Sequence, residues 1–478
     1  MTSALVLLDA PSQLLPAREQ MAFTLMVHVI LVPFGVALPF ITLVMNYLGL
    51  RRDDPVAFQL ARRWSTVMAI QFAIGAVTGT VISLEFGLLW PGLMGKWGDV
   101  FGLAFGIEGW AFFLEAILIA IYIYGWKRMS PRAHFLVGLP LPIVALVGAF
   151  SILSVNAWMN TPQGFTLDSQ GNVTDVELSK VLFTPVLAPQ YLHMIAAAYM
   201  TAGFIIASVY AVGWLRGRRD RYHRLGFLVP FTTAAIITPL QFIIGDALAR
   251  AVYNHQPTKF AAIEIVWNTG PDQPEYIYGQ LQPDGTVAGG VKIPGLDSFL
   301  AGFSRDTVVQ GLSETPAQNR PSITEANIAH FAFDTMVNIA MLLILLTLWF
   351  AIVWIFRRDL PRSRWFFRSA AVAGVASVVA LECGWVTAEV GRQPWVVYEQ
   401  MRVAEAVTNI GAGPIWTSFA IVVVVYALVT WAFIAMLLRL KIRWRQGDAE
   451  ATLAQPEEAP VPSGPGQSTA PTRRGAGP

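Results

Sequence analysis

Long apolar runs, each bounded by polar or charged residues, recur along most of the chain. A membrane-crossing α-helix needs roughly 20 mostly apolar residues, and nine of these runs meet that length. The predicted crossings are Met21–Tyr47, Ser65–Leu89, Phe101–Trp126, Phe135–Trp158, Tyr191–Leu215, Leu225–Leu248, Ile328–Phe356, Ala370–Ala388 and Pro414–Leu438. The pattern predicts an all-α fold, a polytopic membrane helix bundle of about nine transmembrane helices.

Basic residues gather in every second connection between the predicted crossings. By the positive-inside rule, connections rich in Lys and Arg face the cytoplasm. We therefore expect the amino terminus outside and the carboxyl terminus in the cytoplasm, which an odd number of crossings also requires. The basic residues are Arg51, Arg52, Arg62 and Arg63; Lys127, Arg128 and Arg132; Arg216, Arg218, Arg219, Arg221 and Arg224; Arg357, Arg358, Arg362, Arg364 and Arg368; and Arg439, Lys441, Arg443 and Arg445.

The crossings divide the chain into helices one to six (21–248) and seven to nine (328–446), with three further segments. Residues 1–20 have a short apolar run without basic residues before it, so we expect an interfacial segment and no cleaved signal. Residues 249–327 form an extracytoplasmic loop too long for a plain connection, which indicates a function. Residues 447–478 lack apolar periodicity and are predicted to be a disordered cytoplasmic tail.

Composition narrows the chemistry. The chain is 55% hydrophobic and 13% charged, whereas soluble domains have about 25% charged residues. The net charge of +2 gives no indication of a nucleic-acid partner. Cys383 is the single cysteine, which excludes a disulfide framework and cysteine-held iron–sulfur or zinc sites. His, Met, Glu and Asp remain as possible metal ligands.

Two carboxylates, Glu382 and Glu389, end the eighth apolar run seven residues apart. Seven residues make two helical turns, so both share a face. A carboxylate inside a membrane helix is costly unless it lines a protein interior, pairs with a cation, or binds a metal or proton, so a functional site is indicated. Pro394 predicts that the helix ends near Gly391. The structural alternative is that Glu389 sits at the membrane edge, paired with Arg392.

A second acidic pair, Glu108 and Glu115, has the same spacing in the third crossing. At 1.5 Å per residue the two carboxylates lie roughly 10 Å apart along one face. The crossings contain almost no Lys or Arg that could pair with them. A proton relay or a neighbouring metal explains two such acids; the alternative is pairing with cations of other helices.

Three possible metal ligands lie inside crossings: His28, His193 and Met336. An intramembrane imidazole usually forms a hydrogen bond with a neighbouring helix, and a mid-helix Met usually fills a core. Three alanines follow closely after His193, and they would either make room for a large flat group or allow close helix packing. These patterns alone leave both interpretations open.

Taken together, the motifs resemble subunit I of the cytochrome bd quinol oxidases. The string Gly-Arg-Gln-Pro-Trp begins two residues after Glu389 and ends at Trp395, and it is similar to the signature of that family. Further similar strings are Glu-Gly-x-x-Phe-Phe-Leu-Glu from Glu108, His28 with Val-Pro four residues on, Tyr-Leu-His ending at His193, Lys-Phe-Ala-Ala-Ile-Glu from Lys259, and Ile-Pro-Gly-Leu-Asp from Ile293. The resemblance therefore covers nearly the whole membrane part.

The resemblance implies three haems. His193 and Met336 would be the axial ligands of a low-spin haem b, and His/Met ligation raises a haem potential. His28 and Glu389 would each bind one active-site haem, of which one is a high-spin haem b and the other haem d or a further haem b. Two more cofactor-binding residues are implied: Arg392 beside a haem propionate and Trp385 as an aromatic neighbour between haems.

The resemblance also implies the reaction. Lys259 and Glu264 would bind and oxidise quinol at the outer face, while Glu108 and Glu115 would deliver protons for the reduction of dioxygen to water. The enzyme would belong to the respiratory chain of a bacterial cell membrane and generate proton-motive force without pumping. The resemblance implies a homologous membrane subunit II and allows a small single-helix subunit.

One departure from the family pattern is Asp334, where many relatives have Arg. This departure leaves the electrostatics around the low-spin haem open. The type of quinol and the porphyrin on His28 are also left open. Among the other histidines, His134, His223 and His255 are expected to be solvated in loops. Two other classes remain: a membrane dihaem electron-transfer anchor, which would lack the second ligand set, and a secondary transporter, which needs neither the His/Met pair nor the long loop.

Overall fold

The computed structural model describes residues 11–453. Its long helices are α2 (Leu14–Arg52), α3 (Pro55–Leu89), α4 (Pro91–Gly125), α6 (Pro140–Asn160), α8 (Leu187–Leu215), α9 (Arg221–His255), α12 (Ile323–Arg357), α13 (Arg364–Val390) and α15 (Ala412–Leu453). Short helices are α5 (Pro131–Gly138), α7 (Leu178–Leu182), α10 (Pro257–Ile263), α11 (Leu296–Gly302) and α14 (Val403–Ala406).

Short antiparallel strand pairs occupy the connections. They are β1 (Thr166–Leu167) with β2 (Val173–Thr174), β3 (Glu275–Ile277) with β6 (Val291–Ile293), β4 (Gln280–Leu281) with β5 (Val287–Ala288), and β7 (Trp395–Val397) with β8 (Met401–Arg402). The fold is therefore helical, with strands only in loops of the described chain.

Within residues 11–453, nine helical segments are long and apolar enough to cross a membrane. They correspond one to one with the predicted crossings, so the predicted helix bundle is confirmed. The fourth crossing combines α5 and α6, which are separated at Leu139. Most helices extend beyond the apolar run, as in α2, which begins at Leu14 and not at Met21.

Local caps define several helix ends. The Asp54 side chain accepts hydrogen bonds from the first turn of α3 and also pairs with Arg221 at 2.5 Å, which ties α3 to the start of α9. Ser322 and Glu325 form a capping box at the start of α12. Helix α13 ends at Val390, as the downstream proline predicts.

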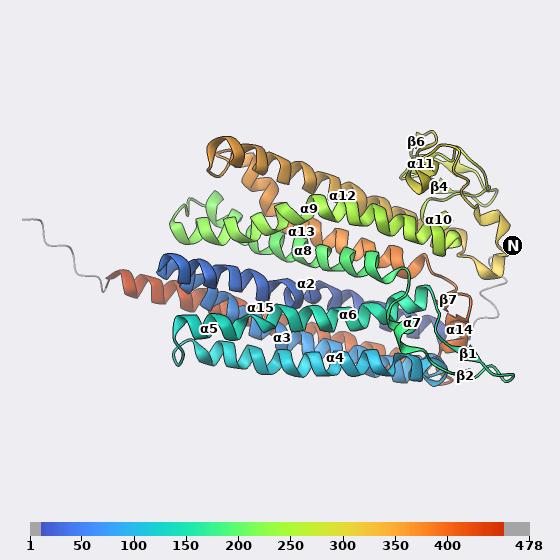
Figure 1. Cartoon of the computed structure of the whole chain (residues 1–478), viewed down its shortest axis with the longest axis horizontal. Coiled ribbons are helices and arrows are strands. Elements are labelled where there is room, and N and C mark those ends of the chain that lie inside the picture. Colours follow the sequence, from blue (N-terminus) through green and yellow to red (C-terminus); the bar gives the residue numbers. More distant parts are fainter. Residues whose placement is uncertain (1–10, 454–478) are drawn as a thin grey trace, which may run out of the picture. The chain divides into compact units, whose positions relative to one another are not determined.

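The long helices from α2 to α13 lie side by side, with their axes roughly aligned (Figure 1). Helix α8 contacts α2, α6, α9 and α13, and α12 contacts α9 and α13. Small residues permit the closest approaches: a Cβ added at Gly203 would lie 2.8 Å from the Pro230 carbonyl oxygen, and one at Gly374 would lie 2.6 Å from Ser208 Oγ. Such contacts are the usual basis of helix packing inside membranes.

The segment between α9 and α12 is folded and has its own core. Phe260, Ile265, Leu281, Val309 and Leu312 are buried together there. Helix α10 contacts α9 and α12, and α11 contacts α9. The loop elements gather at one end of the long helices (Figure 1).

The two ends of the chain complete the description. Residues 1–10, half of the predicted interfacial segment, lie outside the described residues, and so do residues 454–478 of the predicted tail. Helix α15 continues to Leu453 and so includes the first residues of that predicted tail. Within the described residues, the part of α15 from Ala427 onward belongs to a second unit of the chain.

Candidate functional site

Three of the four side chains expected to bind haem lie against a glycine of a neighbouring helix. A Cβ added at Gly79 of α3 would be 3.3 Å from His28 Cε1, and one at Gly245 of α9 would be 3.3 Å from His193 Cε1. A Cβ added at Gly384 of α13 would be 3.0 Å from Met336 Sδ. Because glycine has no Cβ, each of these positions leaves space beside the His or Met side chain.

Polar residues of neighbouring helices orient the two imidazoles. The Nδ1 atom of His28 lies 2.8 Å from Thr78 Oγ1. The amide nitrogen of Gln241 lies 3.2 Å from both ring nitrogens of His193. The Gln241 Oε1 atom is buried and accepts no hydrogen bond within residues 11–453. Sequence reasoning missed both partners, although each is a polar residue inside an apolar crossing, where polar side chains tend to have a function.

The structure brings the helices that carry these side chains together. Helices α2, α8 and α13 contact one another, and α12 contacts α13. A small apolar cluster joins Val29, which follows His28, with Met194, which follows His193, and with Trp385 of α13. Since Met336 Sδ lies against Gly384, next to Trp385, the four helices converge on one region.

Glu389 has polar partners, whereas Glu382 has none in the described chain. Arg392 pairs with Glu389 Oε2 at 2.5 Å, and Asn156 of α6 donates to Oε1 over 3.3 Å. The ion pair of the structural alternative is therefore present. Both carboxylate oxygens of Glu382, and the indole nitrogen of Trp385, are buried without a hydrogen-bond partner among residues 11–453.

The acidic pair of α4 lies apart from these contacts. Glu108 and Glu115 are half-buried, and neither forms an ion pair with any residue that the structure describes. Helix α4 packs on α3, α5 and α6. The alternative of cation partners on other helices of this chain is therefore not observed.

Lys259 connects the long loop with α13. Its side chain is only 6% exposed, and Nζ donates to the Ala388 carbonyl oxygen over 2.9 Å, next to Glu389. Burial, assisted by the charge of Arg392 and opposed by that of Glu389, lowers the pKa of Lys259 to about 7. Lys259 is therefore a buried residue and not a solvated loop lysine.

Glu264 is the C-cap residue of α10 and belongs to a buried acidic cluster with Glu275 and Asp297. Burial and the neighbouring carboxylates raise the pKa values of Glu264 and Asp297 well above their usual range. Glu264 forms no ion pair with Lys259. Sequence reasoning missed Glu275 and Asp297 as buried acids because they occur in a segment rich in Gly and Pro.

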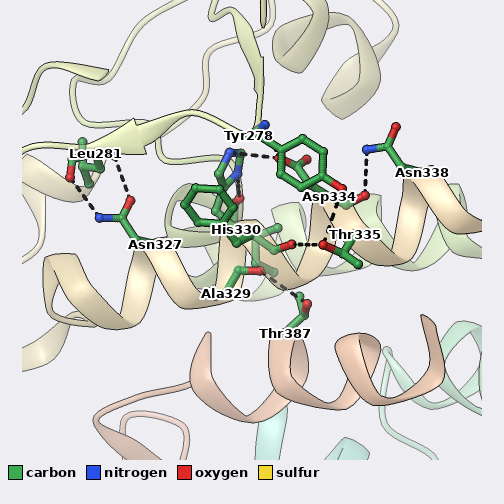
Figure 2. Close-up of polar contacts among 11 residues, drawn as sticks. Tyr278, Leu281, Asn327, Ala329, His330, Asp334, Thr335, Asn338 and Thr387 are labelled. Atoms are coloured by element: carbon green, nitrogen blue, oxygen red, sulfur yellow. Dashed lines mark hydrogen bonds and ion pairs between the residues drawn. The ribbon is translucent and has the colours of Figure 1, made fainter. Parts of the chain in front are cut away.

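The loop is docked on α12 through directed hydrogen bonds (Figure 2). The backbone N–H of Tyr278 donates to Asp334 Oδ2 over 2.5 Å, and His330 Nε2 lies 3.2 Å from the same oxygen. Asn327 forms two bonds with the backbone of Leu281, at 2.8 and 3.0 Å. Asp334, where the sequence departs from the pattern expected by resemblance, thus binds the backbone between β3 and β4.

The prediction that His134 is solvated is wrong. Its side chain is 2% exposed, lies 2.7 Å from the Tyr122 carbonyl oxygen and contacts the tilted rings of Tyr122 in α4 and of Trp126 just after it. Packing of α5 against α4 explains this burial. His223 is mostly buried and pairs with Asp220, whereas His255 is exposed as expected.

A helix bundle of this kind, with His and Met side chains facing glycines inside apolar crossings, defines an integral membrane protein suited to bind haem. Nitrogen, thioether and carboxylate donors of this set fit haem iron. Residues 16–443 match the family model described as cytochrome bd terminal oxidase subunit I. The chain belongs to this family.

Individual relatives agree with the family model. A Bacillus subtilis (strain 168) protein, named provisionally as cytochrome bd menaquinol oxidase subunit I, is 34% identical over 88% of this chain and 95% of its own length. Cytochrome bd ubiquinol oxidase subunit 1 of the same organism is 28% identical over 90% and 93%. The bd oxidase structure from Geobacillus thermodenitrificans superposes with a TM-score of 0.85 at 33% identity, covering 91% of this chain and 99% of that one.

Family membership confirms the predicted enzyme class, a quinol oxidase of the respiratory chain located in a bacterial membrane. It also makes haem the expected cofactor and a second membrane subunit the expected partner. The electron-transfer anchor and the secondary transporter are therefore rejected.

Proposed function

We propose that this subunit binds three haems through four side chains. His193 and Met336 would hold a low-spin haem b, while His28 and Glu389 would each hold one active-site haem, a high-spin haem b and a haem d or further haem b. When bound, the haems would transfer electrons from quinol to dioxygen. The observation that carries this proposal is the glycine beside each of His28, His193 and Met336, where an added Cβ would lie only 3.0 to 3.3 Å from the side chain.

The surrounding residues have positioning roles in this proposal. Thr78 and Gln241 hold the imidazoles of His28 and His193 in orientation. Arg392 fixes the Glu389 carboxylate and keeps its charge balanced; it would also lie beside a propionate. Trp385, whose indole N–H has no partner in the described part of the chain, would face a haem.

Quinol oxidation is assigned to the loop of residues 249–327. Lys259 has a pKa of about 7, so near neutral pH a large fraction is the neutral amine, which can accept a proton from a quinol hydroxyl. Glu264, whose pKa is raised by burial and by neighbouring carboxylates, is assigned to the same quinol site. The bond from Lys259 to the Ala388 carbonyl oxygen supports a quinol site beside the Glu389 segment.

The proposed orientation places the amino terminus outside and the carboxyl terminus in the cytoplasm, as the basic connections require. Quinol protons would then leave on the outer side, whereas protons for water would come from the cytoplasm. Glu108 and Glu115, which have no cationic partner among residues 11–453, would pass these protons from the cytoplasmic side to the site of dioxygen reduction. This separation produces proton-motive force without a pump. From the family resemblance alone, we also propose a small single-helix subunit beside subunit II.

Spectroscopy of the purified complex tests the ligand assignment. We expect His193→Ala and Met336→Leu each to abolish the low-spin haem band in the reduced-minus-oxidised spectrum while the protein still inserts in the membrane. Met341→Leu on the same helix, where the side chain is 47% exposed, is the matched control and should keep the band. An unchanged band in either ligand variant removes these assignments.

Turnover with two electron donors tests the quinol assignment. Glu264→Ala should slow oxidation of quinol more than oxidation of an artificial donor that reduces the haems directly. Glu314→Ala, an exposed acid of the same loop, is the control and should slow neither. Equal slowing with both donors in Glu264→Ala would argue against a role in quinol binding.

A further inference from the structure

Three buried acids from separate segments of the loop converge on one point. Glu264 follows α10, Glu275 lies on β3, and Asp297 lies in the first turn of α11. Their side chains are 7%, 8% and 1% exposed. One carboxylate oxygen of each lies within 4.8 Å of the others. Loop closures of roughly ten and twenty residues bring these segments together, so the convergence is part of the loop fold.

The cluster carries acceptors without donors. Both oxygens of Asp297 and one oxygen of Glu264 are buried without a hydrogen-bond partner within residues 11–453. No Lys or Arg of the described chain pairs with any of the three acids, and the nearby Lys259 donates to Ala388 instead. A buried, nearly inaccessible carboxylate that accepts nothing indicates that a positively charged or proton-donating partner belongs between the acids.

Asp334 of α12 adds to this negative environment. Its negative charge contributes to the raised pKa values of both Glu264 and Asp297. Its own oxygen is held by the Tyr278 N–H and by His330 (Figure 2). The three cluster acids therefore have a fourth carboxylate beside them, while the cation that would balance them is not supplied by the described chain.

We propose that Glu264, Glu275 and Asp297 bind one divalent metal cation, which joins the three segments of the loop. The donor set consists of carboxylate oxygens alone, which suits hard cations and not zinc or copper, since those prefer nitrogen and sulfur. Calcium is favoured because two of its ligands at 2.3–2.6 Å can lie up to about 5.2 Å apart, which includes the spacing of these oxygens, and because it accepts several protein carboxylates. Magnesium usually retains several waters, for which so buried a cluster is less suited.

The cation would position Glu264 for the proposed reaction. It would fix the carboxylate at the end of α10, the same short helix that carries Lys259, and would keep α10, β3 and α11 together. The site goes beyond the proposed function and does not depend on it, because metal content is measured without turnover.

Metal analysis of the purified two-subunit complex tests the site. After exchange into chelator-treated buffer, we expect one calcium ion per copy of this chain in the wild type and a loss of that ion in Asp297→Asn, a nearly isosteric change. Glu314→Gln, an exposed acid of the same loop, should retain it. The haem spectrum serves as the check that each variant is folded.

A second measurement covers the case in which Asp297→Asn does not fold. Wild-type complex stripped with a calcium chelator should unfold at a lower temperature, and added calcium chloride should restore the original value. Stoichiometric magnesium or manganese in place of calcium would still support the site. Equal metal content in wild type and Asp297→Asn, without any calcium-dependent shift in unfolding, would overturn it and leave a protonated acid cluster; zinc as the bound metal would overturn the choice of a hard cation.

Discussion

Replacing Lys259 by Met separates the effect of its buried charge on folding stability from its proposed role in quinol oxidation. The Met side chain keeps much of the apolar stem of Lys259 and removes the ammonium group, which is buried at 6% exposure and bonded to the Ala388 carbonyl oxygen. Lys292→Met is the matched control, because Lys292 lies exposed in the same loop. The change should stabilise the fold at low pH and impair quinol oxidation.

The magnitude follows from the pKa. Burial lowers the pKa of Lys259 from 10.5 to about 7, and each pKa unit corresponds to about 1.36 kcal/mol. Below pH 7 the lysine is protonated in both states, so the folded state bears a cost of about 5 kcal/mol. Met loses the bond to the Ala388 carbonyl oxygen, which costs about 1–3 kcal/mol. The variant should therefore be more stable by about 2–4 kcal/mol at pH 6.

The dependence on pH has a definite sign. Between pH 7 and 10.5 the unfolded chain still binds the proton that the folded protein has released, so wild-type stability rises with pH. The Met variant lacks this rise, and its advantage should shrink by about 1.4 kcal/mol per pH unit. Unfolding midpoints of the purified complex at pH 6, 7.5 and 9 measure the effect. An advantage that does not change with pH, or one equal to that of Lys292→Met, would refute the reasoning.

Two further changes test the helix contacts. Gly384→Ala would place a methyl group 3.0 Å from Met336 Sδ. If thioether binding to the reduced low-spin haem weakens tenfold, the midpoint potential of this haem falls by about 59 mV, which a redox titration measures. The control Gly87→Ala, where an added Cβ has no atom within 4 Å, should leave the potential unchanged. Asp54→Ala removes the α3 cap and the ion pair with Arg221, which should lower the free energy of unfolding by about 1–2 kcal/mol, and no loss in a denaturant titration would contradict it.

The membrane crossings were predictable because each depends on a local property, the length of an apolar run. Their ends were predicted less well, since polar ends are stabilised by partners that lie elsewhere in space. Helix α9, for example, extends to His255, past the predicted end at Leu248, and its last turns contain the ion pair of Arg250 with Asp246. The end of α13 was predicted because Pro394 acts locally.

The candidate site shows the same division. His28, His193 and Met336 could be selected from their own helices and from the family resemblance. The glycines, Thr78 and Gln241 that contact them come from other helices, and no local pattern pairs residues so far apart in sequence. Burial of Glu275 and Asp297 was also not predictable, because acids in a Gly- and Pro-rich loop are normally solvated.

The contacts of the loop explain why buried charges are retained there. Lys259 is bonded to α13 at Ala388, and the Tyr278 N–H is bonded to α12 at Asp334. Helices α12 and α13 meet where Met336 Sδ lies against Gly384. Replacing Lys259 and Asp334 by apolar residues would remove the energetic cost of their burial, but it would also remove the two bonds that tie the loop to both helices. Since close-packed interiors transmit strain, we expect a displacement of the loop to reach the proposed low-spin haem ligand through these contacts.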